Sequence, residues 1–158
     1  MTLPLEGVRI LTVEQYGAGP FGTMWLADQG AEVIKVEMPG AGDTGRLFGP
    51  HIDGESAYFN MLNRGKQSVT VQLKDPAGVE IIRDLIRCSD VLVENFRPGV
   101  MARLGLDYAS VQTLRPELIY ASITGFGTAG GAGLAGYDLL AQALSGLMSV
   151  TGAPDAEG

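Results

Sequence analysis

Short apolar runs alternate with helix-like stripes along most of the chain. The first run, Val8–Val13, is rich in β-branched residues and predicts a strand. Pro20 then suits the first turn of a helix, which should stop near Gly30, and Ala31–Glu37 predicts a second strand. A strand, a helix and a strand in this order form a βαβ unit, whose crossover is nearly always right-handed.

The same alternation continues beyond this unit. Ser68–Leu73 predicts a third strand, and Pro76 opens a helix with one apolar stripe. Asp90–Glu94 and Leu118–Ser122 predict two further strands, and a Gly-rich loop at 125–136 precedes a final amphipathic helix. Five strands that alternate with helices predict an α/β fold, with a Rossmann-like, doubly wound and mostly parallel sheet.

Composition narrows the class of protein. The chain has 158 residues, of which 46% are hydrophobic, and this is enough for one ordinary domain. Its 11 Lys and Arg against 18 Asp and Glu give a formal charge of −7, so we expect no nucleic-acid partner. No apolar run approaches the roughly 20 residues of a membrane helix, so no membrane partner is expected. Cys88 is the only cysteine, which excludes an intrachain disulfide and favours a cytoplasmic location.

The first predicted strand ends in a glycine pattern that has two interpretations. Gly17–Gly22 fits G-x-G-x-x-G, and Glu37 ends the following strand. This spacing is typical of dinucleotide-binding domains, in which the glycines admit a pyrophosphate and the acid binds a ribose hydroxyl. A chain with 23 glycines also produces such a pattern by chance, as a tight strand-to-helix turn. An NAD-binding Rossmann module therefore stays open at this point.

A larger set of sequence blocks points to a family. The blocks that follow GAGP, in order, are LADQGAEVIKVEMPGAGD (26–43), YFNMLNRGKQSV (58–69), LKDPAG (73–78), DVLVENFRPGV (90–100), LGLDY (104–108), IYASITGFG (119–127) and GYDLLAQALSGLMSVTG (136–152). Together they resemble the family III CoA-transferases of the CaiB/BaiF type. That family includes formyl-CoA transferase and carnitine CoA-transferases, and it shares its fold with α-methylacyl-CoA racemase. The resemblance runs from Leu5 to Gly152.

The resemblance implies a domain assignment and a ligand. Residues 1–152 would form a Rossmann-like CoA-binding domain, the large-domain part of the family fold, and residues 153–158 a flexible end. Coenzyme A would be a substrate, with no tightly bound cofactor and no metal. Lys74 and Arg103 would pair with its phosphates, while Val71 and Phe96 would flank its adenine. The implied CoA contacts are Tyr16, Gly17, Ala18, Val71, Lys74, Asn95, Phe96 and Arg103.

Two positions bear on the choice between a transferase and a racemase. Tyr137 and Asp138 resemble a polar pair that lines the thioester pocket, where they would support catalysis. The racemase branch has a His at the position of Tyr137, and Tyr is a poor base at neutral pH, so a transferase is favoured over a racemase.

Family members often carry a basic residue after Glu37, where this chain has Met38, so one nucleotide contact would differ.

The family's nucleophilic Asp is expected to lie beyond the 158 residues. Such an Asp carries acyl-enzyme and enzyme-CoA thioester steps when CoA moves between carboxylic acids. We therefore expect the chain to be the CoA-binding part of a transferase and to be inactive alone. Its expected partners are acyl-CoA and carboxylic acid substrates and either a second copy in an interlocked homodimer or a complementary chain. A non-catalytic binding or assembly fragment is the remaining alternative.

Three isolated reactive residues are assigned no catalytic role. His51 is the only histidine and lies in a polar loop, so we expect it to be exposed and non-catalytic. Cys88 ends an amphipathic helix and is expected to pack there. Asp155 is expected to be mobile, and it does not match the position of the family's nucleophile.

Overall fold

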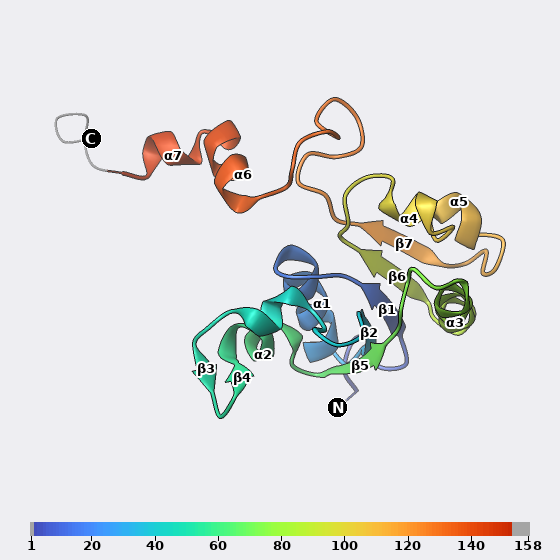
Figure 1. Ribbon diagram of the computed structural model, residues 1–158. Helices are drawn as coiled ribbons and strands as arrows, with labels where there is room; N and C mark the ends of the chain where they lie inside the picture. The colour runs from blue at the N-terminus through green and yellow to red at the C-terminus, as the bar shows by residue number, and fades with distance from the viewer. Residues whose placement is uncertain (1, 153–158) are drawn as a thin grey trace. The chain divides into compact units, whose positions relative to one another are not determined.

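The computed structural model describes residues 2–152 (Figure 1). The chain divides into two compact units at the Ile123–Thr124 bond. The first unit holds the sheet and the helices that cover it, and the second holds the Gly-rich segment and two short helices.

The first unit is built on a five-stranded parallel sheet in the order β5-β2-β1-β6-β7. Its strands are β1 (Arg9–Val13), β2 (Glu32–Glu37), β5 (Lys66–Thr70), β6 (Val91–Glu94) and β7 (Ile119–Ser122). The chain runs outward from β1 through β2 to β5, and then returns to β6 on the other side of β1. The predicted doubly wound sheet is therefore confirmed, and its strand order reverses between β1 and β6, where such sheets bind ligands.

Helices cover both faces of this sheet (Figure 1). They are α1 (Ala18–Asp28), α2 (Ala57–Asn63), α3 (Pro76–Arg87), α4 (Val100–Arg103) and α5 (Tyr108–Val111). Ile10 and Val33 face the side on which Leu26 of α1 packs, whereas Leu11 faces the side on which Ile82 of α3 packs. Because successive side chains of a strand point to opposite faces, the central strands are apolar on both, as their sequence indicates.

The segment between β2 and β5 contains more structure than the sequence predicts. It forms a 3-10 turn, η1 (Thr44–Leu47), a hairpin of β3 (His51–Ile52) and β4 (Glu55–Ser56), and then α2. The hydroxyl of Ser56 caps α2 by accepting a hydrogen bond from the Phe59 amide at 3.1 Å. The third strand of the sheet begins at Lys66 and ends at Thr70, earlier than the predicted Ser68–Leu73. Its first residues are polar, so they do not show the alternation of apolar and polar positions that predicts a strand.

The helix that Pro76 opens is α3, and a side-chain cap fixes its start. Asp75 accepts a hydrogen bond from the Ala77 amide at 2.9 Å, and Pro76 occupies the first turn. The expectation that Cys88 packs there is wrong, because this residue follows the last turn of the helix and is exposed. Its thiol donates to the carbonyl of Leu85 at 3.2 Å.

The second unit contains α6 (Asp138–Ser145) and α7 (Leu147–Val150) after an irregular Gly-rich segment. The expected single amphipathic helix is split by Gly146, whose φ of 79° lies in the left-handed region. No residue of these two helices is buried. Across the part of the chain that the structure describes, no helix is both long and apolar enough to span a membrane.

Candidate functional site at the carboxyl edge of the sheet

The segments that follow β1, β5 and β6 leave the carboxyl edge of the sheet, and they hold eight of the predicted site residues. Tyr16, Gly17 and Ala18 form the turn from β1 into α1, Val71 and Lys74 follow β5, Asn95 and Phe96 follow β6, and Arg103 ends α4. The remaining two, Tyr137 and Asp138, lie at the start of α6 in the second unit, and both are exposed.

The turn after β1 depends on small residues. Tyr16 has a φ of 70°, in the left-handed region that residues with a side chain rarely adopt. A Cβ atom on Gly19 would lie 2.9 Å from Cβ of Glu14 and 3.0 Å from Cγ of Asn95. Gly19 therefore allows the first turn of α1 to approach the ends of β1 and β6 closely.

Asn95 joins the loops after β1 and β6. Its Oδ1 accepts a hydrogen bond from the Gln15 amide at 2.8 Å, and its Nδ2 donates to the Gln15 carbonyl, also at 2.8 Å. The adjacent Phe96 amide donates to Glu94 at 2.9 Å. The side chain of Asn95 thus fixes the two loops on either side of the point where the strand order reverses.

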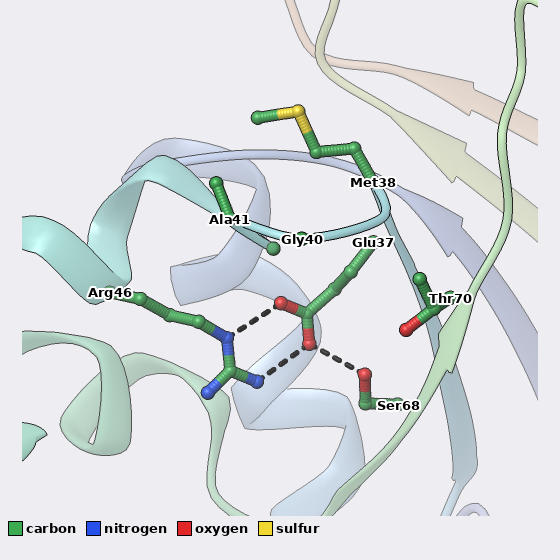
Figure 2. A pocket seen from close by; sticks show the side chains of 8 residues that line it. Glu37, Met38, Gly40, Ala41, Arg46, Ser68 and Thr70 are labelled. Carbon is green, nitrogen blue, oxygen red and sulfur yellow. Dashed lines mark hydrogen bonds and ion pairs between the residues drawn. The ribbon is translucent and has the colours of Figure 1, made fainter.

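A cavity of about 280 Å³ opens beside the ends of β2 and β5. Figure 2 shows Glu37 inside it, with the Arg46 guanidinium on both carboxylate oxygens at 2.7 and 2.8 Å. Its lining residues are Glu37, Met38, Gly40, Ala41, Gly42, Arg46, Ser68 and Thr70. The cavity is therefore made from the Gly-rich loop after β2 and from the polar residues of β5 that face it.

Protein groups saturate the Glu37 carboxylate. Besides Arg46, it accepts hydrogen bonds from the Ser68 hydroxyl at 2.6 Å and the Asp43 amide at 2.9 Å. Burial by itself would raise the pKa of Glu37, but these hydrogen bonds and the charge of Arg46 lower it to about 2. A carboxylate offers about four acceptor positions, and four donors occupy them here. Glu37 is therefore not available to bind a ribose, which weighs against an NAD-binding module.

The two predicted phosphate ligands differ from Arg46. Lys74 and Arg103 are both exposed, and within residues 2–152 their charged groups make no hydrogen bond or ion pair. Val71 is only 4% exposed and belongs to the core, against which Phe96 packs. This side of the sheet thus presents two cations that lack a partner among the described residues, together with a half-buried aromatic ring.

Sequence reasoning missed several polar residues at this edge. The sequence does not single out Arg46 and Ser68 as partners of Glu37, because nothing in their spacing shows that the loop folds back over β2. Lys35 carried a usable signal, since it is a charged residue inside the apolar run AEVIKVE. Within residues 2–152, no three His, Cys, Asp or Glu side chains gather as a metal site would require.

Comparison with known proteins identifies the family. The model of CoA-transferase family III matches residues 5–158. The chain belongs to that family. It is 51% identical over 156 residues to succinyl-CoA:glutarate CoA-transferase of Mus musculus, and 46% identical over 153 residues to acetyl-CoA:oxalate CoA-transferase of Acetobacter aceti. The resemblance noted from the sequence blocks is confirmed.

The same relationship holds in three dimensions. A CaiB/BaiF family protein of Brucella suis superposes on this family III chain with a TM-score of 0.92 at 43% sequence identity. The match covers 98% of the chain and 42% of that structure. The mouse and Acetobacter matches cover 98% and 96% of the chain, but only 36% and 39% of the relatives. The family III chain thus spans less than half the length of these relatives.

Proposed function

We propose that this chain forms the CoA-binding part of a transferase that moves coenzyme A between carboxylic acids. The observation that carries the proposal is the pairing of a charge-neutralised cavity with unpaired cations at one sheet edge. The names of its relatives support the substrate class, since each describes a CoA thioester exchanging with a dicarboxylic acid.

The chemistry of CoA matches this edge. Its nucleotide end carries a flat adenine, a pyrophosphate and a 3′-phosphate. The cavity beside Glu37 has its acid neutralised by Arg46, so it suits the uncharged adenine ring better than a phosphate. Lys74, on the loop that follows β5, and Arg103 remain free to bind phosphate oxygens.

The covalent chemistry needs a nucleophile. In the complete protein, a carboxylate nucleophile would attack the thioester carbonyl carbon and release the CoA thiolate, which leaves an acyl-enzyme anhydride. We assign that nucleophile to an Asp outside these 158 residues, and Tyr137 and Asp138 to the wall of the thioester pocket. The chain alone would then bind CoA without turning over.

Association with another chain is part of the proposal. The two helices of the second unit expose apolar side chains, including Leu139 at 70% and Leu144 at 60%. Exposed apolar side chains that lie close together favour association with another chain. We therefore propose that a second copy, in an interlocked homodimer, or a complementary chain covers them.

Calorimetric titration of the chain with CoA, dephospho-CoA and NAD tests the proposed function. CoA should bind and NAD should not. Lys74→Ala and Arg103→Ala should weaken CoA by about tenfold and dephospho-CoA by less, because only CoA carries the 3′-phosphate. Arg87→Ala is the control, since Arg87 is an exposed arginine at the C-terminal end of α3, just before β6 and therefore at the opposite, amino edge of the parallel sheet.

Two outcomes would refute the assignment. Equal losses for CoA and dephospho-CoA would show that neither cation binds the 3′-phosphate. NAD binding without CoA binding would show that the edge of the sheet is a dinucleotide site after all.

A further inference from the structure

Four charged side chains lie buried beneath the loops of the carboxyl edge, outside the cavity that holds Glu37. Glu14 follows β1, Lys35 lies in β2, Asp43 lies in the loop before η1, and Lys66 begins β5. The exposed fraction of each side chain is 2% or less. Two carboxylates and two ammonium groups thus share one interior site.

Direct contacts join the four groups into a single cluster. Lys35 Nζ lies 2.7 Å from Asp43 Oδ2 and 3.8 Å from Glu14 Oε1. Lys66 Nζ lies 2.9 Å from the same Glu14 oxygen and also donates to the Pro20 carbonyl at 2.9 Å. The cluster therefore connects β1, β2, β5 and the start of α1.

Stability alone does not account for this cluster. Oε2 of Glu14 is buried without a hydrogen-bond partner among the described residues. A buried carboxylate oxygen left unpaired costs free energy. Well-packed apolar residues often stabilise an interior at least as much as buried ion pairs do. The contacts that the cluster makes with the neighbouring loops therefore offer a better reason for its presence.

It holds the turn after β1. Asp43 Oδ1 accepts hydrogen bonds from the Tyr16 amide at 3.0 Å and the Gly45 amide at 2.7 Å. Lys35 Nζ donates to the Glu14 carbonyl at 3.4 Å. Tyr16 has the positive φ that a residue with a side chain keeps only when its surroundings impose it. One carboxylate oxygen thus joins the first loop to the loop before η1.

We propose that Asp43 is a positioning residue of the CoA site, with Lys35 as its buried counter-ion. Asp43 touches no substrate in this role. It acts through the Tyr16 amide, which it holds so that the turn from Tyr16 to Ala18 is already shaped when CoA arrives. A preformed loop spares the binding step the cost of ordering it. This inference rests on the proposed function, because it takes CoA as the ligand of that turn.

Two double variants isolate the acceptor oxygen. Lys35→Met/Asp43→Asn removes both charges but keeps an oxygen that can accept from the Tyr16 and Gly45 amides. Lys35→Met/Asp43→Ala removes the charges and the oxygen. Neither leaves an unpaired ion from the Lys35–Asp43 pair, so the comparison reports on the hydrogen bonds alone. Ile86→Val changes a fully buried side chain of α3 and provides a variant that loses stability without touching these loops.

Two measurements are made on each variant of the 158-residue chain. The first is amide hydrogen exchange at Tyr16 and Gly45 by NMR, without ligand, and the second is the dissociation constant for CoA by calorimetry. The Ala variant should exchange at Tyr16 about tenfold faster and bind CoA about tenfold more weakly. The Asn variant should stay within about threefold of the wild type in both. Ile86→Val should change neither, although its Tm falls.

The outcomes separate this inference from the proposed function. If the wild type binds CoA and the Ala and Asn variants lose affinity equally, or only in step with Tm, Asp43 does not position the loop. If the wild type binds no CoA, the proposed function fails and the role of Asp43 in binding fails with it. Unchanged exchange at Tyr16 in the Ala variant would further show that Asp43 does not hold the turn.

Discussion

The Glu37 carboxylate should make the stability of the protein depend on pH in the acid range. It accepts four hydrogen bonds, two of them from the Arg46 guanidinium, and its pKa is lowered to about 2 from an ordinary value of 4.5. An acid whose pKa is lower in the folded state stabilises that state above its unfolded pKa. The contribution is lost as pH falls from 4.5 towards 2.

The size of the effect follows from the same two values. Their difference corresponds to about 3 kcal/mol at neutral pH, at 1.36 kcal/mol for each pKa unit. Water reaches Arg46, whose side chain is 42% exposed, so we expect about 2 kcal/mol to be measured. Glu37→Gln should therefore lower the free energy of unfolding by about 2 kcal/mol at pH 7, since the neutral amide loses the charge that Arg46 pairs with.

Urea unfolding followed by circular dichroism, at several values between pH 3 and pH 7, checks this prediction. The gap between the wild type and Glu37→Gln should be widest at pH 7 and should narrow below pH 4.5. Glu32→Gln is the matched control, because the Glu32–Arg9 ion pair is substantially exposed on both sides and should matter much less. A gap of constant size across the whole range would refute the reasoning.

Two further substitutions test how the loops are held. Asn95→Ala removes both hydrogen bonds to Gln15 and should lower the free energy of unfolding by about 1–3 kcal/mol and weaken CoA binding. Urea unfolding and calorimetry measure the two effects, and unchanged CoA affinity would show that Asn95 does not shape the site. Gly78→Ala would place a Cβ atom 2.1 Å from the Gln72 carbonyl oxygen, so it should force the backbone to move and destabilise the fold by about 2 kcal/mol or more. Gly40→Ala is its control, since Gly40 has a φ of 83° with open space around it and should cost only about 1 kcal/mol, measured as the shift in Tm. Equal shifts for the two glycines would contradict the close approach at Gly78.

Most of the sheet could be predicted from the sequence because its signals are local. Val8–Val13 and Asp90–Glu94 are short apolar runs next to turn residues, and each contains a strand of the structure. Pro76 fixes the start of α3 through backbone geometry that needs no tertiary partner. The glycines and the ordered blocks also placed the candidate residues in loops at strand ends. Right-handed crossovers between parallel strands leave few possible arrangements, and the structure supplies the strand order among them.

The interior of the site was decided only by the tertiary structure. Glu37 fitted a ribose-binding acid in the sequence, but folding brings Arg46 and Ser68 onto it from two other segments. Lys66 and Asp43 look like surface charges in the sequence, but folding places Lys66 against Glu14 and Asp43 against Lys35, with both side chains buried. A side chain's neighbours along the chain set its backbone preference. Its charge state and its partners depend on groups that only the folded chain brings within a few ångströms.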